Sequence, residues 1–238
     1  MNIALQLYSI RDALAADYQG TLEQVKNIGY TGVELFGDHL PAAEIKNLLK
    51  TLQLEPVAHH FAFDPLKADF AACLERTAAT GSKIIVCAWS AASPERPWES
   101  ILTDLAQMNA QATAFGLTFV YHNHDHEISQ YVGGKRVLDA ILECCDLEID
   151  VAWVQAGGLN PTDYVQQHAQ KAKLLHIKDV KLEAGNWQTV ELGQGSVPLA
   201  AILEQAPKTA SSWLIVEQDH SPDPIGSAAR NFAWLQAQ

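Results

Sequence analysis

The chain has 238 residues, of which 48% are hydrophobic and 18% charged, as in compact globular proteins and unlike disordered chains. Its formal net charge of -12, from 16 basic and 28 acidic residues, argues against nucleic acid and anionic membranes as partners. The amino terminus does not read as a signal peptide, and no apolar stretch approaches the ~18 residues that span a bilayer, so we expect a cytoplasmic protein.

Short runs rich in β-branched and aromatic residues alternate with longer amphipathic segments along the chain. Eight runs are predicted to be strands, namely residues 3–10, 32–37, 55–61, 83–89, 117–124, 147–153, 173–180 and 212–219. The predicted helices between and after them include residues 21–29, 41–52, 64–81, 98–116, 135–145, 161–171 and 223–238. Asp64 and Asn160, each followed by a proline, are expected to cap helix starts. Gly29, Gly81 and Gly116 are expected to end helices.

Eight strand–helix units, spaced by roughly 25 to 30 residues, predict a (β/α)₈ TIM barrel. We expect a single domain over residues 1–238, since no linker or shift in composition divides the chain. A doubly wound open sheet is the main rival. Neither a dinucleotide-binding glycine motif nor a P-loop follows the first strand, which counts against it.

In such a barrel the functional side chains gather where the strands end, around a shared mouth. Predicted strands end in polar residues, listed in chain order as Glu34, His59, His60, His122, His124, Asp150, His176, Lys178, Glu217 and Asp219. Because side chains alternate along a strand, His122 shares a face with His124, and Glu148 shares a face with Asp150. The apolar residues between them suit the layer beneath the helices. We therefore expect the polar set to point into the barrel.

Carboxylates gathered at the mouth would repel one another unless a cation joined them. The predicted metal ligands are His122, Asp150, His176 and Glu217, a set of nitrogen and oxygen donors that suits Mn, Co, Zn, Fe or Mg. The sequence does not distinguish among these divalent metals.

The other polar residues receive separate interpretations. Glu34 is expected behind the metal or in contact with substrate, and His60, Trp153 and Glu127 are expected to contact substrate. His59 is interpreted as a hydrogen-bonded structural residue, while His39 and His126 are interpreted as solvated loop residues. Trp89, Trp153 and Trp187 either line a sugar-binding mouth or belong to the core or rim. The segment LGQGSV, residues 192–197, is expected to form a loop at the mouth.

Five motifs resemble those of the sugar phosphate isomerase/epimerase family, the xylose-isomerase-like barrels that also include inosose dehydratases and endonuclease IV. They are YHNHDHE, LEIDVAWVQAGGLNP, LLHIKDVK, ELGQGSV and WLIVEQD, and the likeness covers essentially the whole chain. The resemblance implies a divalent metal held by Glu, Asp, His and Glu from strands five to eight. Asp150, His176 and Glu217 match the last three ligands, whereas His122 stands where the first glutamate is expected. Two glutamates exchange protons in the epimerases of this family, so the substitution counts against two-base epimerisation.

We expect a metal-dependent sugar isomerase or epimerase that acts on a keto sugar or sugar derivative through an enediolate-type intermediate. Glu217 is the expected base, Lys178 the expected proton donor or anion contact, and His124 or Glu127 the replacement for the missing carboxylate. The alternative is a lyase or dehydratase, either inosose dehydratase-like or keto-glycoside eliminating. A sugar-binding protein without catalysis is a further alternative. An acidic chain short of ligands argues against a DNA repair nuclease.

The expected partner is a small sugar or polyol, phosphorylated or not, since no phosphate site is evident in the sequence. Pairing into a homodimer is compatible with a barrel of this kind, through its loops or outer helices.

Overall fold

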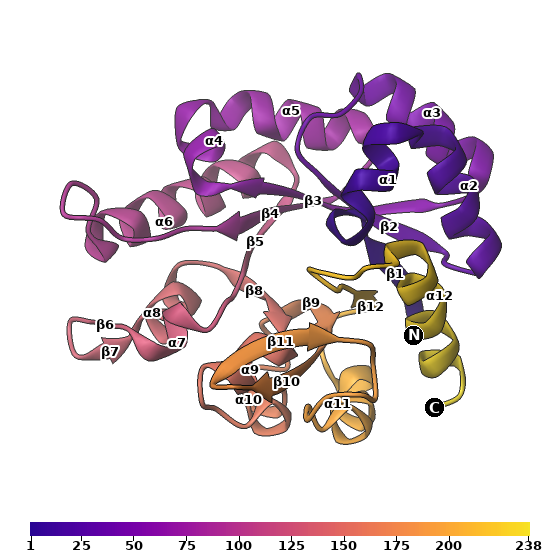
Figure 1. The fold of residues 1–238 in the computed structure, drawn as a ribbon. Helices are drawn as coiled ribbons and strands as arrows, with labels where there is room; N and C mark the ends of the chain where they lie inside the picture. Colours follow the sequence, from indigo (N-terminus) through magenta and orange to yellow (C-terminus); the bar gives the residue numbers. More distant parts are fainter.

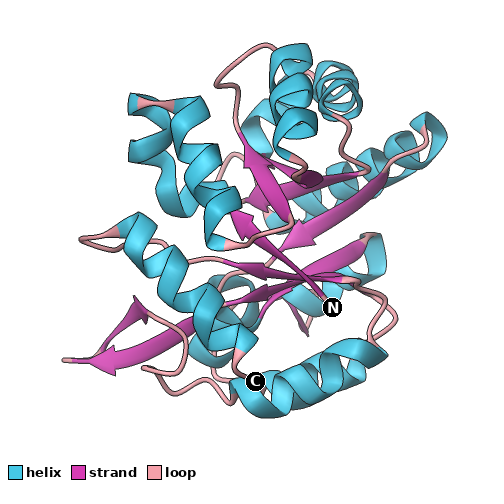
Figure 2. Ribbon diagram, turned by 90° about the vertical axis from the view of Figure 1, so that its right-hand side faces the viewer, coloured by secondary structure: helices cyan, strands magenta, loops and turns pink.

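Eight parallel strands close into a barrel surrounded by helices in a computed structural model that describes residues 1–238 (Figures 1 and 2). In order around the barrel, the strands are β1 (Asn2–Gln6), β12 (Trp213–Val216), β9 (Ala172–Ile177), β8 (Asp146–Asp150), β5 (Thr118–His122), β4 (Ile84–Trp89), β3 (Glu55–Ala62) and β2 (Gly32–Phe36). Each barrel strand pairs with its nearest barrel strands along the chain, and the last pairs with the first. The predicted single-domain (β/α)₈ barrel is confirmed.

Helices return the chain from the end of each strand to the start of the next. They are α1 (Arg11–Ala16), α2 (Tyr18–Ile28), α3 (Ala42–Leu52), α4 (Phe63–Ala68), α5 (Phe70–Thr80), α6 (Trp98–Phe115), α7 (His126–Ser129), α8 (Val137–Cys144), α9 (Val151–Ala156), α10 (Pro161–Gln167), α11 (Leu199–Gln205) and α12 (Pro224–Gln236), with 3-10 turns η1 (Leu7–Ile10) and η2 (Ala206–Lys208). None of them combines the length and the apolar character needed to cross a membrane. The two chain ends lie on the same side of the barrel, where α12 approaches β1 (Figure 1).

Several predicted helix ends are confirmed by the caps that form there. Gly29, Gly81 and Gly116 each follow the last residue of a helix with a positive φ, which glycine adopts without a steric penalty. The Asn160 side chain accepts hydrogen bonds from the backbone N–H groups of Thr162 and Asp163 and so caps α10.

The prediction that Asp64 caps a helix over residues 64–81 is wrong. Helix α4 already begins at Phe63, and the Asp64 carboxylate forms an ion pair with Arg96 instead. The chain then breaks at Asp69, whose side chain accepts a hydrogen bond from the backbone N–H of Ala72 and starts α5. One predicted helix is therefore two, because a capping side chain in its middle satisfies the first turn of a second helix.

Several predicted strands are too long, two of them because polar side chains start helical turns at their ends. The Gln6 side chain accepts from the backbone N–H of Tyr8, and η1 replaces the end of the first predicted strand. Asp150 caps α9 through Ala152 and Trp153, so residues 151–153 are helical. The eighth strand ends at Val216, which places the following acidic residues just beyond it.

The apolar core has two layers, one inside the barrel and one between the strands and helices. The inner layer consists of Ala4, Val57, Ala58, Val86, Val120, Leu174, Trp213 and Ile215. Gly32 makes room for it, because a Cβ at that position would lie 2.7 Å from the Trp213 ring. The outer layer contains Leu175, Ile177, Leu214 and Val216, as the alternation predicts. Apolar residues thus fill the lower barrel and leave its upper end to polar side chains.

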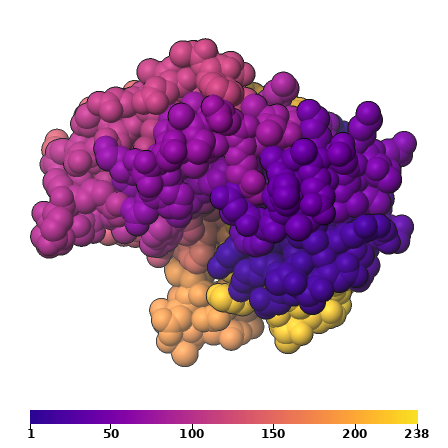
Figure 3. Space-filling view, turned by 90° about the horizontal axis from the view of Figure 1, so that it is seen from above, coloured from indigo at the N-terminus to yellow at the C-terminus, as the bar shows by residue number.

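A β-hairpin that was not predicted follows β9. Its strands, β10 (Asp179–Glu183) and β11 (Asn186–Val190), pair antiparallel, and the orange segment that contains them stands out from the surface in Figure 3. A second small hairpin joins β6 (Tyr131–Val132) to β7 (Lys135–Arg136). The predicted loop at residues 192–197 lies behind the first hairpin, where the buried Asp179 carboxylate accepts hydrogen bonds from the backbone of Gly193, Gly195 and Val197. This carboxylate fixes one wall of the barrel mouth.

Candidate active site

Four predicted side chains meet at the upper end of the barrel, at the ends of β5, β8, β9 and β12. Each of His122, Asp150, His176 and Glu217 offers one donor atom, and the four atoms lie within 4.8 Å of one another. The His176 Nδ1 atom lies 3.0 Å from Glu217 Oε2 and 3.9 Å from Asp150 Oδ2. The His122 Nε2 atom lies 3.9 Å from the same Asp150 oxygen. We name these four residues the upper group.

The donors of the upper group fit a divalent cation. Asp150 uses Oδ1 to cap α9, whereas its buried Oδ2 accepts no hydrogen bond, faces the two imidazoles and lies 3.1 Å from Lys178 Nζ. Three carboxylates, those of Asp150, Glu217 and Asp219, share that one ammonium, and a metal ion would supply further positive charge. Two imidazole nitrogens and two carboxylate oxygens are a donor set suited to several divalent transition metals. The residues present therefore fit such a metal.

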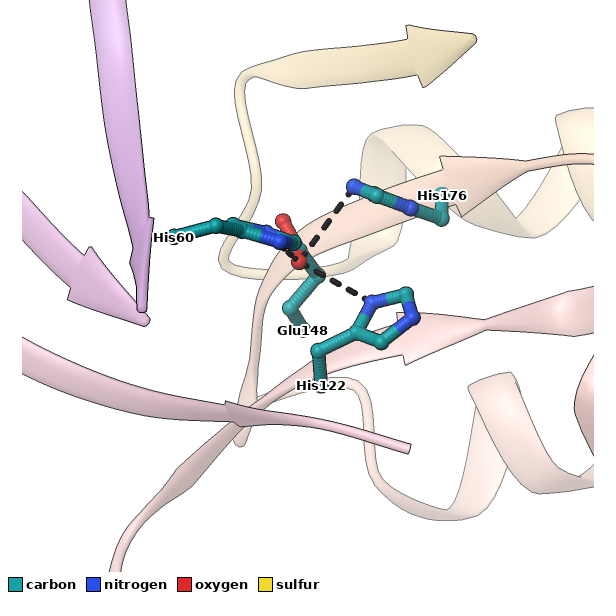
Figure 4. A group of neighbouring side chains, drawn as sticks. All are labelled: His60, His122, Glu148 and His176. Carbon is teal, nitrogen blue, oxygen red and sulfur yellow. Dashed lines mark hydrogen bonds and ion pairs between the residues drawn. The ribbon is translucent and has the colours of Figure 1, made fainter. Parts of the chain in front are cut away.

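A second set of donors lies one layer deeper and centres on Glu148 (Figure 4). The fully buried Glu148 Oε2 atom lies 2.6 Å from His60 Nε2 and 3.1 Å from His122 Nδ1. It also lies 3.3 Å from His176 Nε2. Sequence reasoning did not select Glu148 as a site residue, although strand alternation had placed it on the inner face beside Asp150. That shared face was the signal available.

Glu34 occupies the same lower layer and does not reach the barrel mouth. Its Oε2 atom lies 2.6 Å from His176 Nε2 and 3.0 Å from His60 Nε2, and it accepts a hydrogen bond from the Gln6 side chain at 2.7 Å. Glu34 is fully buried, and it is absent from the lining of the mouth. Glu34 was expected either behind the metal or in contact with substrate, and its position agrees with the first of these.

The two layers divide the ring nitrogens of the histidines between them. His122 turns Nδ1 to Glu148 and Nε2 toward Asp150, while His176 turns Nε2 to Glu34 and Nδ1 toward Glu217. Metal-binding histidines characteristically donate their second ring N–H to a carboxylate, which fixes the ring orientation and the tautomer. In this arrangement the upper group would face a bound metal, and the lower carboxylates would orient its histidines.

His60 links the two lower carboxylates. Burial by itself would lower the pKa of His60, but the adjacent carboxylates of Glu34 and Glu148 outweigh it and raise this pKa to about 10. The positive charges of His176 and His60 likewise hold the pKa of Glu148 well below its usual range, against the effect of burial. His60 therefore carries a proton that lets two buried carboxylates lie close together.

Lys178 is buried beside the upper group, just after β9. Its Nζ atom lies 2.7 Å from Glu217 Oε2, 3.1 Å from Asp150 Oδ2 and 3.1 Å from Asp219 Oδ2. Although burial opposes it, the nearby Asp150, Asp219 and Glu217 carboxylates raise the pKa of Lys178 well above its usual value. The same ammonium helps to keep the pKa of Glu217 well below normal despite burial. Lys178 is thus charged and held behind the carboxylates, not at the cavity wall.

A cavity of about 1020 Å³ opens above the upper group. The predicted site residues that line it are His60, His122, His124, Trp153 and Glu217. Trp89 and Trp187 line it as well, so all three tryptophans belong to the mouth. The cavity lining does not include Glu34, Glu127, Asp150, His176 or Lys178. The last three lie beneath its floor or behind its wall, in or beside the upper group.

His124 follows β5 and stands in the cavity wall. Its ring centroid lies 4.7 Å from that of Trp89 and 4.9 Å from that of His122. Burial, followed by the charges of His122 and Lys178, lowers the pKa of His124 well below its usual value, so its imidazole is neutral. The imidazole has an Nδ1 atom without a hydrogen-bond partner that can accept a proton, although the lowered pKa makes it a weak base.

Glu127 supports this segment from behind. Its fully buried carboxylate accepts hydrogen bonds from the His124 backbone N–H at 2.8 Å and the Tyr121 hydroxyl at 2.6 Å. The expectation that Glu127 contacts substrate therefore does not agree with its position. His126 is not a solvated loop residue as predicted, because it begins α7 and its Nε2 atom lies 2.9 Å from the Ser90 carbonyl oxygen.

Two further histidines with predicted roles lie where the sequence places them. His59 is buried, and its Nε2 atom lies 3.0 Å from the carbonyl oxygen of Gly37, in agreement with a structural role. His39 is exposed in the loop that precedes α3.

Comparisons with known proteins agree with this fold. A family model described as xylose isomerase-like TIM barrel matches residues 22–238. The inosose dehydratase of Geobacillus thermodenitrificans strain NG80-2 is 22% identical over 149 residues, which span 54% of this chain and 49% of that protein. The structure of a sugar phosphate isomerase/epimerase from Parabacteroides distasonis ATCC 8503 is similar with a TM-score of 0.83 and 23% identity, covering 100% of this chain and 98% of that one. A structure of the IolI protein with a bound zinc atom gives a TM-score of 0.75 and 17% identity, covering 100% and 96% of the chains.

Proposed function

Because the chain belongs to the xylose isomerase-like TIM barrel family, we propose that it is a divalent-metal-dependent isomerase or epimerase of keto sugars. The observation that carries the proposal is the upper group, His122, Asp150, His176 and Glu217, whose donors converge beneath a cavity of about 1020 Å³. A divalent cation bound there would polarise a substrate carbonyl and fix a neighbouring hydroxyl. The zinc atom bound by the IolI protein, which has a similar fold, supports a divalent metal in this chain.

Glu217 is the proposed base. Its carboxylate lines the cavity, and its pKa is held well below normal, so it is ionised and faces the substrate. It would remove the proton from the carbon between the carbonyl and the hydroxyl and leave an enediolate of the substrate. The ammonium of Lys178, 2.7 Å from Glu217 Oε2, holds that carboxylate in place. Lys178 itself is proposed to act through Glu217, since it does not reach the cavity.

His124 is the proposed partner of Glu217 for returning the proton. Its neutral imidazole stands in the cavity wall, where an acid–base group is needed if no second glutamate is present. Return of the proton to the neighbouring carbon gives isomerisation, and return to the opposite face of the same carbon gives epimerisation. A neutral His124 would accept a proton from a substrate hydroxyl and deliver it to carbon. The proton held by Glu217 would then pass to the substrate oxygen that is a hydroxyl in the product, so both side chains return to their starting states.

A lyase or dehydratase is the second candidate, and the similarity to an inosose dehydratase favours it. The first step is the same proton removal by Glu217. The electron pair then expels a leaving group from the adjacent carbon, so that a carbon–oxygen bond breaks and an unsaturated ketone forms. The two functions differ only in what happens to the enediolate.

Hydrogen exchange tests the proposal directly. The protein, equilibrated with Mn²⁺, would be incubated in D₂O with a panel of ketoses, inososes and keto-glycosides, and products followed by NMR and mass spectrometry. We expect metal-dependent deuterium incorporation that falls about 10²–10⁴-fold in Glu217→Gln, as for loss of a general base. The exposed control Glu183→Gln is expected to retain it. Unchanged mass apart from deuterium indicates isomerisation, whereas a lost leaving group indicates elimination. Exchange in none of the compounds, or full exchange in Glu217→Gln, would refute the assignment.

A further inference from the structure

The cavity above the upper group is lined by carboxylates but by no lysine or arginine. Its acidic lining residues are Asp38, Glu217 and Asp219. The protonated His60 in its lining already contacts two buried carboxylates. A phosphate group carries up to two negative charges and is normally bound by arginine, lysine or a cluster of backbone N–H groups. A phosphorylated sugar would therefore meet like charges here and no free cationic side chain.

The nearest cations are already engaged elsewhere. Lys178 is fully buried among three carboxylates. Arg11 lines a neighbouring hollow of about 330 Å³ and donates hydrogen bonds to the carbonyl oxygens of Tyr8 and Asp219. Its guanidinium also lies over the Tyr8 ring, 4.2 Å from the ring centroid. Arg76 forms an ion pair with the Asp38 carboxylate and donates a hydrogen bond to the carbonyl oxygen of Leu40. Arg11 carries no such carboxylate partner, so it is the rim cation that an anionic substrate would recruit, and it serves as the test of that alternative.

The cavity is also larger than one sugar ring requires. Its volume of about 1020 Å³ lies at the upper end of the ~300–1,000 Å³ typical of pockets that hold drug-sized ligands. A monosaccharide has only about a dozen heavy atoms and would leave much of this space to water. The volume fits a ligand of two linked rings.

Aromatic side chains stand on opposite sides of the mouth. Trp89 is the last residue of β4 and is 46% exposed, and His124 follows β5. Tyr8 follows β1 and Phe36 is the last residue of β2. Their rings pack edge to face with centroids 5.4 Å apart, and Tyr8 is 41% exposed. Exposed apolar groups that line a cavity mark ligand-binding surfaces, and the apolar faces of sugar rings stack on such side chains. The mouth thus offers two aromatic walls, one beside the upper group and one across from it.

Resting on the proposed function, we propose that the substrate is a neutral saccharide of two rings. The reacting ring lies over Glu217 and His124. The second ring occupies a far subsite, which we define by Tyr8, Phe36, Asp38, Phe61 and Pro65, all of which line the cavity at the ends of β1, β2 and β3. In this subsite the exposed Asp38 carboxylate, which also pairs with Arg76, accepts hydrogen bonds from the hydroxyls of a neutral sugar, whereas it would repel a phosphate.

Calorimetric titration of the full chain with bound Mn²⁺ tests the proposal without requiring turnover. The probes are the disaccharides maltose, cellobiose, sucrose and trehalose, the monosaccharides glucose and fructose, and the 6-phosphates of both monosaccharides. The tightest disaccharide is expected to bind at least tenfold more tightly than the tightest monosaccharide, and neither phosphate more tightly than its parent sugar. Tyr8→Ala and Asp38→Asn are expected to weaken disaccharide binding at least threefold and to leave monosaccharide binding within twofold. The matched control is Tyr131→Ala, an exposed tyrosine outside the cavity.

Three results would overturn the inference. The first is equal or tighter binding of a monosaccharide than of every disaccharide, or no measurable binding of any neutral sugar. The second is tighter binding of a 6-phosphate than of its parent sugar, lost in Arg11→Gln, which would assign an anion site to the rim. The third is disaccharide binding that Tyr8→Ala and Asp38→Asn leave unchanged. In each of these cases deuterium exchange into keto monosaccharides is still expected, because it depends only on Glu217 and the metal. Failure of the far subsite is therefore distinguishable from failure of the proposed chemistry.

Discussion

Replacing Lys178 with methionine is expected to destabilise the metal-free protein by about 3–5 kcal/mol, the range for removing one partner of a buried ion pair. The side chain is fully buried, and its Nζ atom lies 2.7 Å from Glu217 and 3.1 Å from both Asp150 and Asp219. Methionine fills a similar volume, so the loss of stability is due mainly to removal of the positive charge. Without the ammonium, three carboxylates face one another and at least one must be protonated on folding.

The same substitution is expected to tighten metal binding. Lys178 contacts the very oxygens of Asp150 and Glu217 that face the imidazoles, so ammonium and metal compete for one negative site. Unit charges about 4 Å apart interact by roughly 4 kcal/mol at an effective dielectric constant of about 20. Relief of even part of this repulsion predicts at least tenfold tighter binding of Mn²⁺ in Lys178→Met, since about 1.4 kcal/mol is tenfold.

Urea unfolding with and without Mn²⁺, followed by tryptophan fluorescence, measures both effects. Metal is expected to stabilise Lys178→Met more than the native protein, because stabilisation grows with the ratio of metal concentration to Kd. The control Lys135→Met removes an ion pair that is 55% exposed on the lysine side and should cost at most about 1 kcal/mol. A loss below 1 kcal/mol in metal-free Lys178→Met, or weaker metal binding by that variant, would refute the reasoning.

Three further outcomes follow from the same structure. Glu34→Gln, compared with the exposed control Glu44→Gln, is expected to weaken Mn²⁺ binding about 10–100-fold in a calorimetric titration, because it removes the carboxylate that orients His176; equal affinities would contradict this. Burial lowers the pKa of His59 from 6.5 to about 4, so the unfolded chain binds more protons between these pH values and stability rises with pH across that window, by roughly 3 kcal/mol in all. His59→Gln should remove this rise in urea unfolding curves taken from pH 4 to 7, and an unchanged rise would assign it to other groups. Asp179→Ala leaves four backbone N–H groups without their acceptor, so it is expected to lower the free energy of unfolding by at least ~3 kcal/mol and to expose the hairpin to proteases. A loss below 1 kcal/mol would show that the loop at residues 192–197 keeps its conformation without this carboxylate.

The meeting of the four predicted metal ligands could be predicted because strand geometry fixes their positions. A period of two puts alternate residues on one face, and parallel strands bring their carboxyl ends to one rim. His122, Asp150, His176 and Glu217 therefore come together although 95 residues separate the first from the last. The same rule placed Glu148 inward, but a second layer of carboxylates beneath the first is recognised only from the distances between side chains.

The ends of the elements were less predictable because local hydrogen bonds decide them. Gln6 and Asp150 both lie in strands by their apolar neighbours, yet each side chain accepts backbone N–H groups two or three residues later and starts a helical turn. Nothing in the periodicity of the apolar residues reports such a bond.

The hairpin was missed because its turn has an uncommon sequence. Ala184 and Gly185 both have positive φ, a conformation for which Asn-Gly is the usual signal. An alanine at the first of these positions hides the turn. The strands on either side carry many polar residues, so the alternation of apolar and polar residues gave no clear prediction. The wall of the cavity that this hairpin forms was therefore not predicted either.

Cobalt titration of the EDTA-treated protein tests the central claim most directly. We expect one Co²⁺ per chain with visible absorption bands of a nitrogen and oxygen site, and at least a hundredfold loss of affinity in both Asp150→Asn and Glu217→Gln. The control Asp139→Asn, a partly exposed residue on α8 outside the cavity, should bind as the native protein does. One Co²⁺ bound with native affinity and spectrum by both site variants would contradict the assignment of the metal to these four side chains.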